Sequence, residues 1–241
     1  MNVERYLEQR RLRRQQEPKF RTLCETCRQP DFTCYCQHLR PFDPKIQFLI
    51  LIHPLEKRRR VATGRMSHLT LKGSRLITGY DYTENAELNS YLDDPDNHCV
   101  VLYPGRQSIN LTTLARHERE SVFTAGKRPV VIVLDGTWST AGKMLHRSSN
   151  VLRLPRICFT PPKPSNFRVR QQPKPECWST LEALHHVIEL TGHTQGFDTS
   201  ARGHDGLLHV FDKMVEQQLE FIRTTHQWRR RSRHYRGRAV D

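Results

Sequence analysis

PVVIVLDGTWSTAGKML, residues 129–145, is the stretch of sequence that decides the fold. Residues 130–134 are an unbroken run of valine, isoleucine and leucine with the length of a strand buried on both faces. Such strands are typical of parallel sheets, because helices cover both of their faces. Asp135 and Gly136 then end the run with turn-forming chemistry. The stretch therefore predicts an α/β fold with a mostly parallel sheet and flanking helices.

A helix is expected to follow this turn. Ser139 or Thr140 can cap it, and residues 141–146 can form its body. In open α/β sheets, ligands collect outside the carboxyl ends of strands and beside helix N-termini. We therefore expect the active site at the end of this strand. The side chains placed there are those of Asp135, Thr137, Trp138 and Ser139.

Length and charge bound the possible functions. A chain of 241 residues suits one α/β domain with appendages, or two small domains. A formal net charge of +14 and a pI near 9.9 predict a polyanionic partner, which can be RNA, DNA or an anionic membrane. We find no stretch of membrane-spanning length and no secretory signal, so we expect a cytoplasmic protein that does not enter membranes.

Four of the seven cysteines lie close together near the N-terminus. They form a Cys-x-x-Cys pair and, after a six-residue gap, a Cys-x-Cys pair. Four thiolates around one ion suit structural zinc, and they leave no position open for a substrate. Disulfides or unrelated thiols are the alternatives. The expected zinc ligands are Cys24, Cys27, Cys34 and Cys36.

Other apolar runs predict the remaining strands. Residues 46–52 and 99–103 read as buried strands, and shorter strands are expected at residues 76–80 and 151–154. The second of these runs ends in Pro104 and Gly105, a turn that lets the backbone approach a ligand closely, or a plain turn. The fold is therefore expected to contain several strands beside the central one.

The remaining segments predict helices and one long loop. The basic run at residues 57–60 is expected to open a helix, and residues 160–175 are too rich in proline for one. That region reads as a long loop, with a basic lid over the site as its functional alternative. Ser179 and Glu182 form a capping box, and residues 207–222 carry an apolar helical stripe.

Both ends of the chain are basic. Residues 1–21 can form a solvated helix or contact nucleic-acid phosphate. Residues 223–238 hold arginines interleaved with Trp228 and Tyr235, a composition that suits phosphate contact and base stacking. We expect RNA binding there, with a disordered basic tail as the alternative.

A nucleotide-hydrolase loop is disfavoured. Gly136, Gly142 and Lys143 follow the central strand, but five residues separate the two glycines where a phosphate-binding loop has four. Met144 stands where that loop has the serine or threonine that binds magnesium.

Five short motifs in one order resemble the DTW-domain family. They are the four cysteines, YPG at residues 103–105, DGTW at residues 135–138, LPR at residues 154–156 and WSTLEA at residues 178–183. Their order and the overall size resemble the bacterial tRNA-uridine aminocarboxypropyltransferases of that family. The tripeptide Asp-Thr-Trp itself is absent, because Gly136 is inserted in it.

This resemblance implies a fold related to the SPOUT RNA methyltransferases, with a C-terminal trefoil knot. It divides the chain into a basic arm and zinc motif (1–44), a catalytic domain (45–225) and a basic tail (226–241). The implied reaction transfers the 3-amino-3-carboxypropyl group of S-adenosylmethionine to N3 of a tRNA uridine, in the variable loop, and releases methylthioadenosine. A SPOUT-type methyltransferase and a non-catalytic zinc-containing RNA-binding protein are the alternatives.

Chemical roles follow for individual residues. Asp135 is the candidate general base for the N3 proton, or it orients the sulfonium or the amino group. Trp138 offers a face for a base or for the sulfonium cation, or simply packs on the sheet. The resemblance implies that Ser179, Thr180 and Glu182 also line the donor pocket, although the capping box is a sufficient reason for Ser179 and Glu182. The expected donor-binding residues are Tyr103, Pro104, Gly105, Asp135, Gly136, Thr137, Trp138, Ser139, Thr140, Ser179, Thr180 and Glu182.

Arginines spread along the chain are expected to contact or steer tRNA, because phosphate contacts carry most of the affinity for nucleic acid. The set comprises Arg58, Arg59, Arg153, Arg156, Arg168, Arg170, Arg229, Arg230, Arg231 and Arg233.

Overall fold

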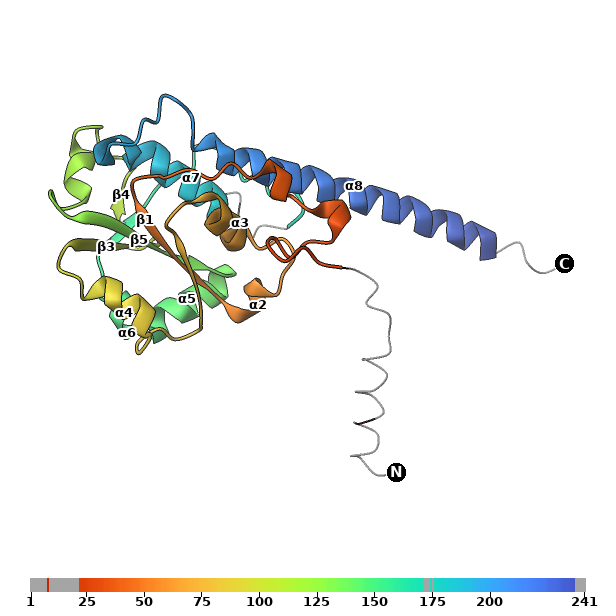
Figure 1. Ribbon diagram of the computed structural model, residues 1–241, viewed down its shortest axis with the longest axis horizontal. Coiled ribbons are helices and arrows are strands. Elements are labelled where there is room, and N and C mark those ends of the chain that lie inside the picture. Colours follow the sequence, from red (N-terminus) through yellow and green to blue (C-terminus); the bar gives the residue numbers. More distant parts are fainter. Residues whose placement is uncertain (1–7, 9–21, 171–173, 175, 237–241) are drawn as a thin grey trace.

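The computed structural model describes residues 8, 22–170, 174 and 176–236, with side chains described up to Thr224 (Figure 1). The predicted basic arm therefore lies outside the described residues except for Glu8. The side chains of the four tail arginines, Arg229, Arg230, Arg231 and Arg233, also lie outside the described part, although their backbone belongs to a helix.

A six-stranded parallel sheet forms the centre of the molecule (Figure 1). Its strand order is β2-β1-β5-β3-β6-β4, so the predicted central strand β5 lies between β1 and β3. The predicted α/β class and the mostly parallel sheet are confirmed. The strands are β1 (Gln47–Ile52), β2 (Arg75–Thr78), β3 (Asn97–Leu102), β4 (Ile109–Asn110), β5 (Arg128–Asp135) and β6 (Arg156–Cys158).

Helices cover both faces of this sheet (Figure 1). Strand residues alternate between two buried clusters, because successive side chains of a strand point to opposite faces. Ile50 and Val131 belong to the cluster of α3, α7 and α8, whereas Leu51 and Ile132 belong to that of α4, α5 and α6. The helices are α2 (Pro54–Lys57), α3 (Thr63–Thr70), α4 (Ala86–Leu92), α5 (Trp138–Arg147), α6 (Ser149–Leu152), α7 (Thr180–Thr191) and α8 (Asp205–Arg236), with short 3-10 turns at Asp31–Thr33, Cys36–His38, Glu118–Val122 and Gly192–Gln195.

The register of the sheet brings functional strand ends together. Asp135, the last residue of β5, pairs with Ile52, the last residue of β1. The backbone N–H of His53 also donates to the Asp135 carbonyl at 2.9 Å. The end of β5 is thus held by hydrogen bonding to the β1 chain, and α5 follows it in sequence. The Asp135 side chain therefore lies at a strand end, beside the start of a helix.

Three local predictions are wrong. The strand expected at residues 151–154 is replaced by α6 and then β6. The reason is tertiary: Ser148 Oγ accepts from Tyr82 N at 3.0 Å and the Asn150 amide donates to Tyr82 O at 2.8 Å, which anchors this segment as a helical turn with Val151 buried.

The two other errors concern helix starts. The basic run at residues 57–60 begins at the last residue of α2 and continues beyond it instead of opening a helix, and α3 begins only at Thr63. Buried Arg65 explains this, because its guanidinium donates to the carbonyls of Lys57 and Arg59 and holds the run in an irregular path. Helix α5 is capped by Thr137 instead of Ser139 or Thr140 and begins one turn earlier than expected.

Helix α8 is longer than its apolar stripe. It continues from Asp205 to Arg236 and projects beyond the body of the sheet domain (Figure 1). Residues 159–179 connect β6 to α7 with no helix or strand in their described part, which agrees with the predicted long loop. Within the described residues, no helix has the length and apolar character that a membrane crossing requires.

Candidate active site

A cavity of about 260 Å³ lies at the carboxyl end of β5. Four segments meet there: the β5–α5 junction, the segment before α3, the long loop and the start of α7. The cavity is where the sequence places it, at the strand end beside a helix start. Its lining comprises Arg59, Thr63, Asp135, Gly136, Thr137, Trp138, Phe167, Arg170, Trp178, Ser179 and Thr180.

Asp135 is the buried acid of this cavity, with 5% of its surface exposed. Its Oδ1 accepts a hydrogen bond of 2.6 Å from the Thr180 hydroxyl. Its Oδ2 is buried beside Gly64, whose backbone N–H also lowers the pKa of this acid, and it has no side-chain hydrogen-bond partner among the described residues. Burial raises the pKa of Asp135 to about 6, against the lowering effect of the Thr180 hydrogen bond. A carboxylate with one free oxygen and a pKa near neutral is suited to accept a proton.

Gly64 lets α3 approach this carboxylate. A Cβ at Gly64 would lie 2.4 Å from Asp135 Oδ2, closer than any side-chain atom can come. Residue 64 therefore has to be glycine while Asp135 keeps this position. No local pattern indicates this contact, because Gly64 and Asp135 are far apart in the chain.

The first turn of α5 presents Trp138 at the edge of the cavity. Its side chain is 43% exposed, and its ring centroid lies 6.1 Å from that of Tyr103. The Thr137 hydroxyl accepts from the Thr140 backbone N–H at 3.2 Å, so this amide is already bonded within the chain. Ser139 is exposed and does not line the cavity. Of the predicted residues in this turn, Thr137 and Trp138 reach the cavity.

Ser179 and Thr180 reach the cavity from the start of α7, but Glu182 does not. The predicted capping box is confirmed, with Ser179 and Glu182 bonded reciprocally. The buried Glu182 carboxylate also accepts from Ser165 Oγ at 2.7 Å and from Asn166 N at 2.8 Å. Glu182 thus joins the long loop to α7, and the capping-box explanation accounts for it better than donor contact.

Two of the ten predicted RNA-binding arginines, Arg59 and Arg170, line the cavity. Arg170 makes a two-pronged ion pair with buried Glu56, with N–O distances of 3.0 and 3.3 Å. Arg59 approaches the same carboxylate at 3.4 Å. Glu56 is not among the residues predicted from the sequence. It carries no local signal, since a glutamate in a short helix is ordinarily solvated.

The other predicted arginines with described side chains lie elsewhere. Arg58 and Arg153 are exposed and do not line the cavity. Arg168 lines a separate groove beside α8, together with Phe32 and Arg223. Arg156 is half-buried and donates to the Leu152 carbonyl at 3.2 Å. Only these placements, and no contact with RNA, follow from the structure.

The YPG turn sits beside the cavity and not in it. Pro104 and Gly105 are exposed, and Tyr103 contacts the cavity only through the ring of Trp138. A Cβ at Gly105 would meet Arg156 Nη1 at 3.4 Å, an ordinary contact. Residue 105 therefore has room for a side chain, and the close approach of this turn to a ligand stays a prediction.

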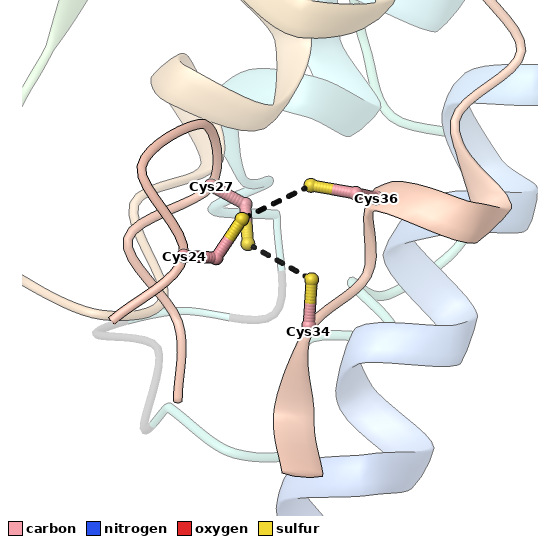
Figure 2. A group of neighbouring side chains, drawn as sticks. All are labelled: Cys24, Cys27, Cys34 and Cys36. Atoms are coloured by element: carbon pink, nitrogen blue, oxygen red, sulfur yellow. Dashed lines mark hydrogen bonds between the residues drawn. The ribbon is translucent and has the colours of Figure 1, made fainter. Parts of the chain in front are cut away.

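The four predicted zinc ligands converge (Figure 2). Their sulfur atoms lie within 4.8 Å of one another, with 3.6 Å between Cys24 and Cys36 and between Cys27 and Cys34. A tetrahedron with Zn–S bonds of about 2.3 Å has edges of about 3.8 Å. The backbone N–H groups of Cys27 and Thr26 lower the pKa of Cys24 to about 6, which favours the thiolate that binds metal, whereas burial raises the pKa of Cys27 and of Cys36. The residues therefore fit structural zinc.

Fold and site together define a parallel α/β protein with a strand-end cavity, which contains a buried carboxylate, two arginines and two tryptophans, and with a separate four-cysteine loop. The chain belongs to the DTW domain family, which it matches over residues 21–219. This confirms the family inferred from the five motifs.

The chain is also similar in sequence to proteins that are named for their activity. The chain is 33% identical over 174 residues to tRNA-uridine aminocarboxypropyltransferase 2 of Drosophila melanogaster, covering 68% of this chain and 64% of that protein. It is 29% identical over 165 residues to the protein of the same name from Mus musculus, covering 66% and 53%. The chain thus spans between about half and two thirds of the length of these relatives. No solved structure matches it.

Proposed function

We propose that this protein transfers the 3-amino-3-carboxypropyl group of S-adenosylmethionine to N3 of a uridine in tRNA, in the variable loop. The observation that carries the proposal is Asp135, a buried carboxylate with a raised pKa and one unpaired oxygen, in a cavity of a DTW-domain chain. The names of the relatives and the excess of positive charge support a tRNA substrate.

Asp135 acts as the base in this proposal. Uridine N3 carries a proton that has to leave for the nitrogen to attack, and Oδ2 is the acceptor atom without a partner. Since the pKa of Asp135 is about 6, the carboxylate is mostly ionised at neutral pH. The new bond joins N3 to carbon, the C–S bond of the donor breaks, and its electron pair stays on sulfur, which leaves as methylthioadenosine.

The aromatic rings supply binding surface for a flat, cationic donor. Trp138 and Trp178 both line the cavity, and indole faces attract a sulfonium as well as a stacked base. The Trp178 indole N–H donates to the Lys163 carbonyl at 2.8 Å, which fixes the ring to the long loop.

Further parts of the proposal rest on the family alone. They are the relation to SPOUT methyltransferases with a trefoil knot, the cytoplasmic location, and the division into zinc motif (1–44), catalytic domain (45–225) and basic tail (226–241). The parallel sheet and the projecting basic helix α8 are compatible with them. Zinc would be held by the four cysteines as a structural ion, and contacts of the basic tail and surface arginines with tRNA belong to the same proposal.

The test is incubation of the purified protein with unmodified tRNA and S-adenosylmethionine, followed by mass spectrometry of the nucleosides. We expect uridine with an added aminocarboxypropyl group, and methylthioadenosine as the second product. A methylated nucleoside instead would support the methyltransferase. An Asp135→Asn variant that binds tRNA but yields no product rejects the binding-only protein, and an unchanged product from that variant rejects Asp135 as the base.

A further inference from the structure

We propose that Arg170, assisted by Arg59, binds the carboxylate of the donor's amino-acid end and thereby sets which carbon of the donor reacts. The inference rests on the proposed function and assigns a role to residues that sequence reasoning gave to RNA. It follows from the location of the two guanidinium groups, from how they are held and from the charge of the cavity.

Arg170 is held firmly and is partly buried. Its side chain is 25% exposed, and both terminal nitrogens bond to the two oxygens of Glu56. A guanidinium has five N–H donors in a rigid fork, so this pair leaves donors for a second carboxylate. Because Glu56 is buried on α2, the fork is oriented before any ligand arrives. Such preorganisation reduces the entropy cost of binding.

The charges of the cavity match an amino acid. Among its described lining residues, the charged side chains are those of Asp135, Arg59 and Arg170. The Glu56 carboxylate offsets one of the two guanidinium charges, which leaves one positive charge in excess beside the acid Asp135. The aminocarboxypropyl group carries a carboxylate, which this excess positive charge complements, and Asp135 remains available as the base.

The alternative anion site is already occupied within the chain. A helix N-terminus is a common anion site, but the Thr140 N–H at the start of α5 is already bonded to Thr137 Oγ1. Arg59 and Arg170 are therefore the lining groups best able to bind an anion. A charge-assisted, two-pronged hydrogen bond is also the stronger contact.

Position decides the reaction because the methyl carbon and the aminocarboxypropyl carbon are bonded to the same sulfur. An enzyme selects between them by which one it holds against the attacking nitrogen. If the protein holds the carboxylate of the aminocarboxypropyl group in a fixed position, the reactive carbon of that group is constrained as well. The methyl carbon is not constrained in this way. Arg170 would then be a specificity-determining residue of the donor site.

The experiment compares two ligands that differ in the group of interest. Isothermal titration of the full chain with S-adenosylmethionine and with methylthioadenosine, which lacks the aminocarboxypropyl group, is repeated for Arg170→Met and Arg59→Met. We expect both variants to lose affinity for S-adenosylmethionine, by about 10- to 100-fold for Arg170→Met. The affinity of both variants for methylthioadenosine should stay within about twofold of that of the unaltered protein. If the arginines only supported the fold, binding of both ligands would weaken together. Arg58→Met, at a neighbouring exposed arginine outside the cavity, is the matched control.

Other results overturn the inference. Equal weakening of both ligands by Arg170→Met would mean that Arg170 only holds the cavity together. Unchanged binding of S-adenosylmethionine in both variants would mean that the carboxylate binds elsewhere, with the proposed function intact. If the unaltered protein binds neither ligand, the proposed function itself fails. Should Arg170→Met fail to fold, Arg59→Met still decides the matter, because Arg59 is mostly outside the core.

Discussion

The Thr180 hydroxyl donates a hydrogen bond of 2.6 Å to Oδ1 of Asp135, which joins the first residue of α7 to the last residue of β5 across 45 residues of sequence. This contact sets two properties of the acid at once. It fixes the orientation of the carboxylate so that Oδ2 remains free, and it lowers the pKa of Asp135 against the larger effect of burial.

Replacement of Thr180 by valine should therefore shift the pH dependence of the reaction. Loss of the hydrogen bond raises the pKa of Asp135, and a base with a higher pKa is ionised only at higher pH. We expect the acidic limb of kcat/KM against pH to move to higher pH in Thr180→Val, with Thr180→Ser close to the unaltered protein. An acidic limb that stays in place would show that it does not report on Asp135.

Burial of Asp135 should also cost stability at neutral pH. Its folded pKa of about 6 lies above the ordinary value of 3.8, so the folded state binds the proton more tightly than the unfolded state. Stability from this group is present below pH 4 and is lost as the pH rises towards 6. The shift corresponds to about 3 kcal/mol above pH 6, at about 1.4 kcal/mol for each pKa unit.

Denaturant unfolding of Asp135→Asn between pH 4 and pH 8 measures this effect. The variant should gain unfolding free energy relative to the unaltered protein as the pH rises, by up to about 3 kcal/mol, while the proposed transferase activity is lost. A difference in stability that does not depend on pH would mean that Asp135 is not forced into an ionised state by the fold.

Local patterns in the sequence predicted β5 and its terminal acid because a run of apolar β-branched residues that ends in Asp-Gly has few alternative structures. The same reasoning failed at residues 151–154. There the apolar residues pack on the sheet as a helical turn, held by contacts of Ser148 and Asn150 with distant Tyr82. Long-range contacts of this kind have no periodicity that a sequence can reveal.

The candidate site divides in the same way. Thr137, Trp138 and Thr180 lie close in sequence to predicted strand or helix ends, so their approach to the cavity was foreseeable. Gly64 and Glu56 were not, because each acts on a residue far along the chain. Glu182 shows the reverse case, since the local capping pattern explained it better than the family resemblance did.

Glu182 is expected to hold the long loop in place. Its carboxylate accepts hydrogen bonds from Ser165, Asn166 and Ser179, whereas a glutamine has a single acceptor oxygen and an added donor. Glu182→Gln should lower the unfolding free energy by about 1–3 kcal/mol and free the loop. Trypsin should then cut after Arg168 faster than in the unaltered protein, whereas Glu84→Gln, at an exposed glutamate between β2 and α4, should leave the rate unchanged. Equal cleavage in both variants would contradict this role.

The four-cysteine loop is bonded to the basic segment that lines the cavity. Gln29, fully buried, donates to the Arg60 carbonyl at 2.6 Å, and Arg65 donates to the carbonyl of Cys27 as well as to those of Lys57 and Arg59. Metal binding by the cysteines should therefore order residues 57–60, because it would fix the loop whose Gln29 side chain and Cys27 carbonyl contact Arg60 and Arg65.

Removal of one ligand tests this coupling. Cys34→Ser should reduce bound zinc from one ion per chain, measured by elemental analysis, and should expose the bonds after residues 57–60 to trypsin. Cys158→Ser, at a half-buried thiol on β6, should change neither. Arg65→Met separates the two effects, since it should keep the zinc and still free the basic segment. If the zinc-depleted protein resists trypsin at these residues as well as the loaded protein does, the loop does not position Arg59, and the metal serves only its own segment.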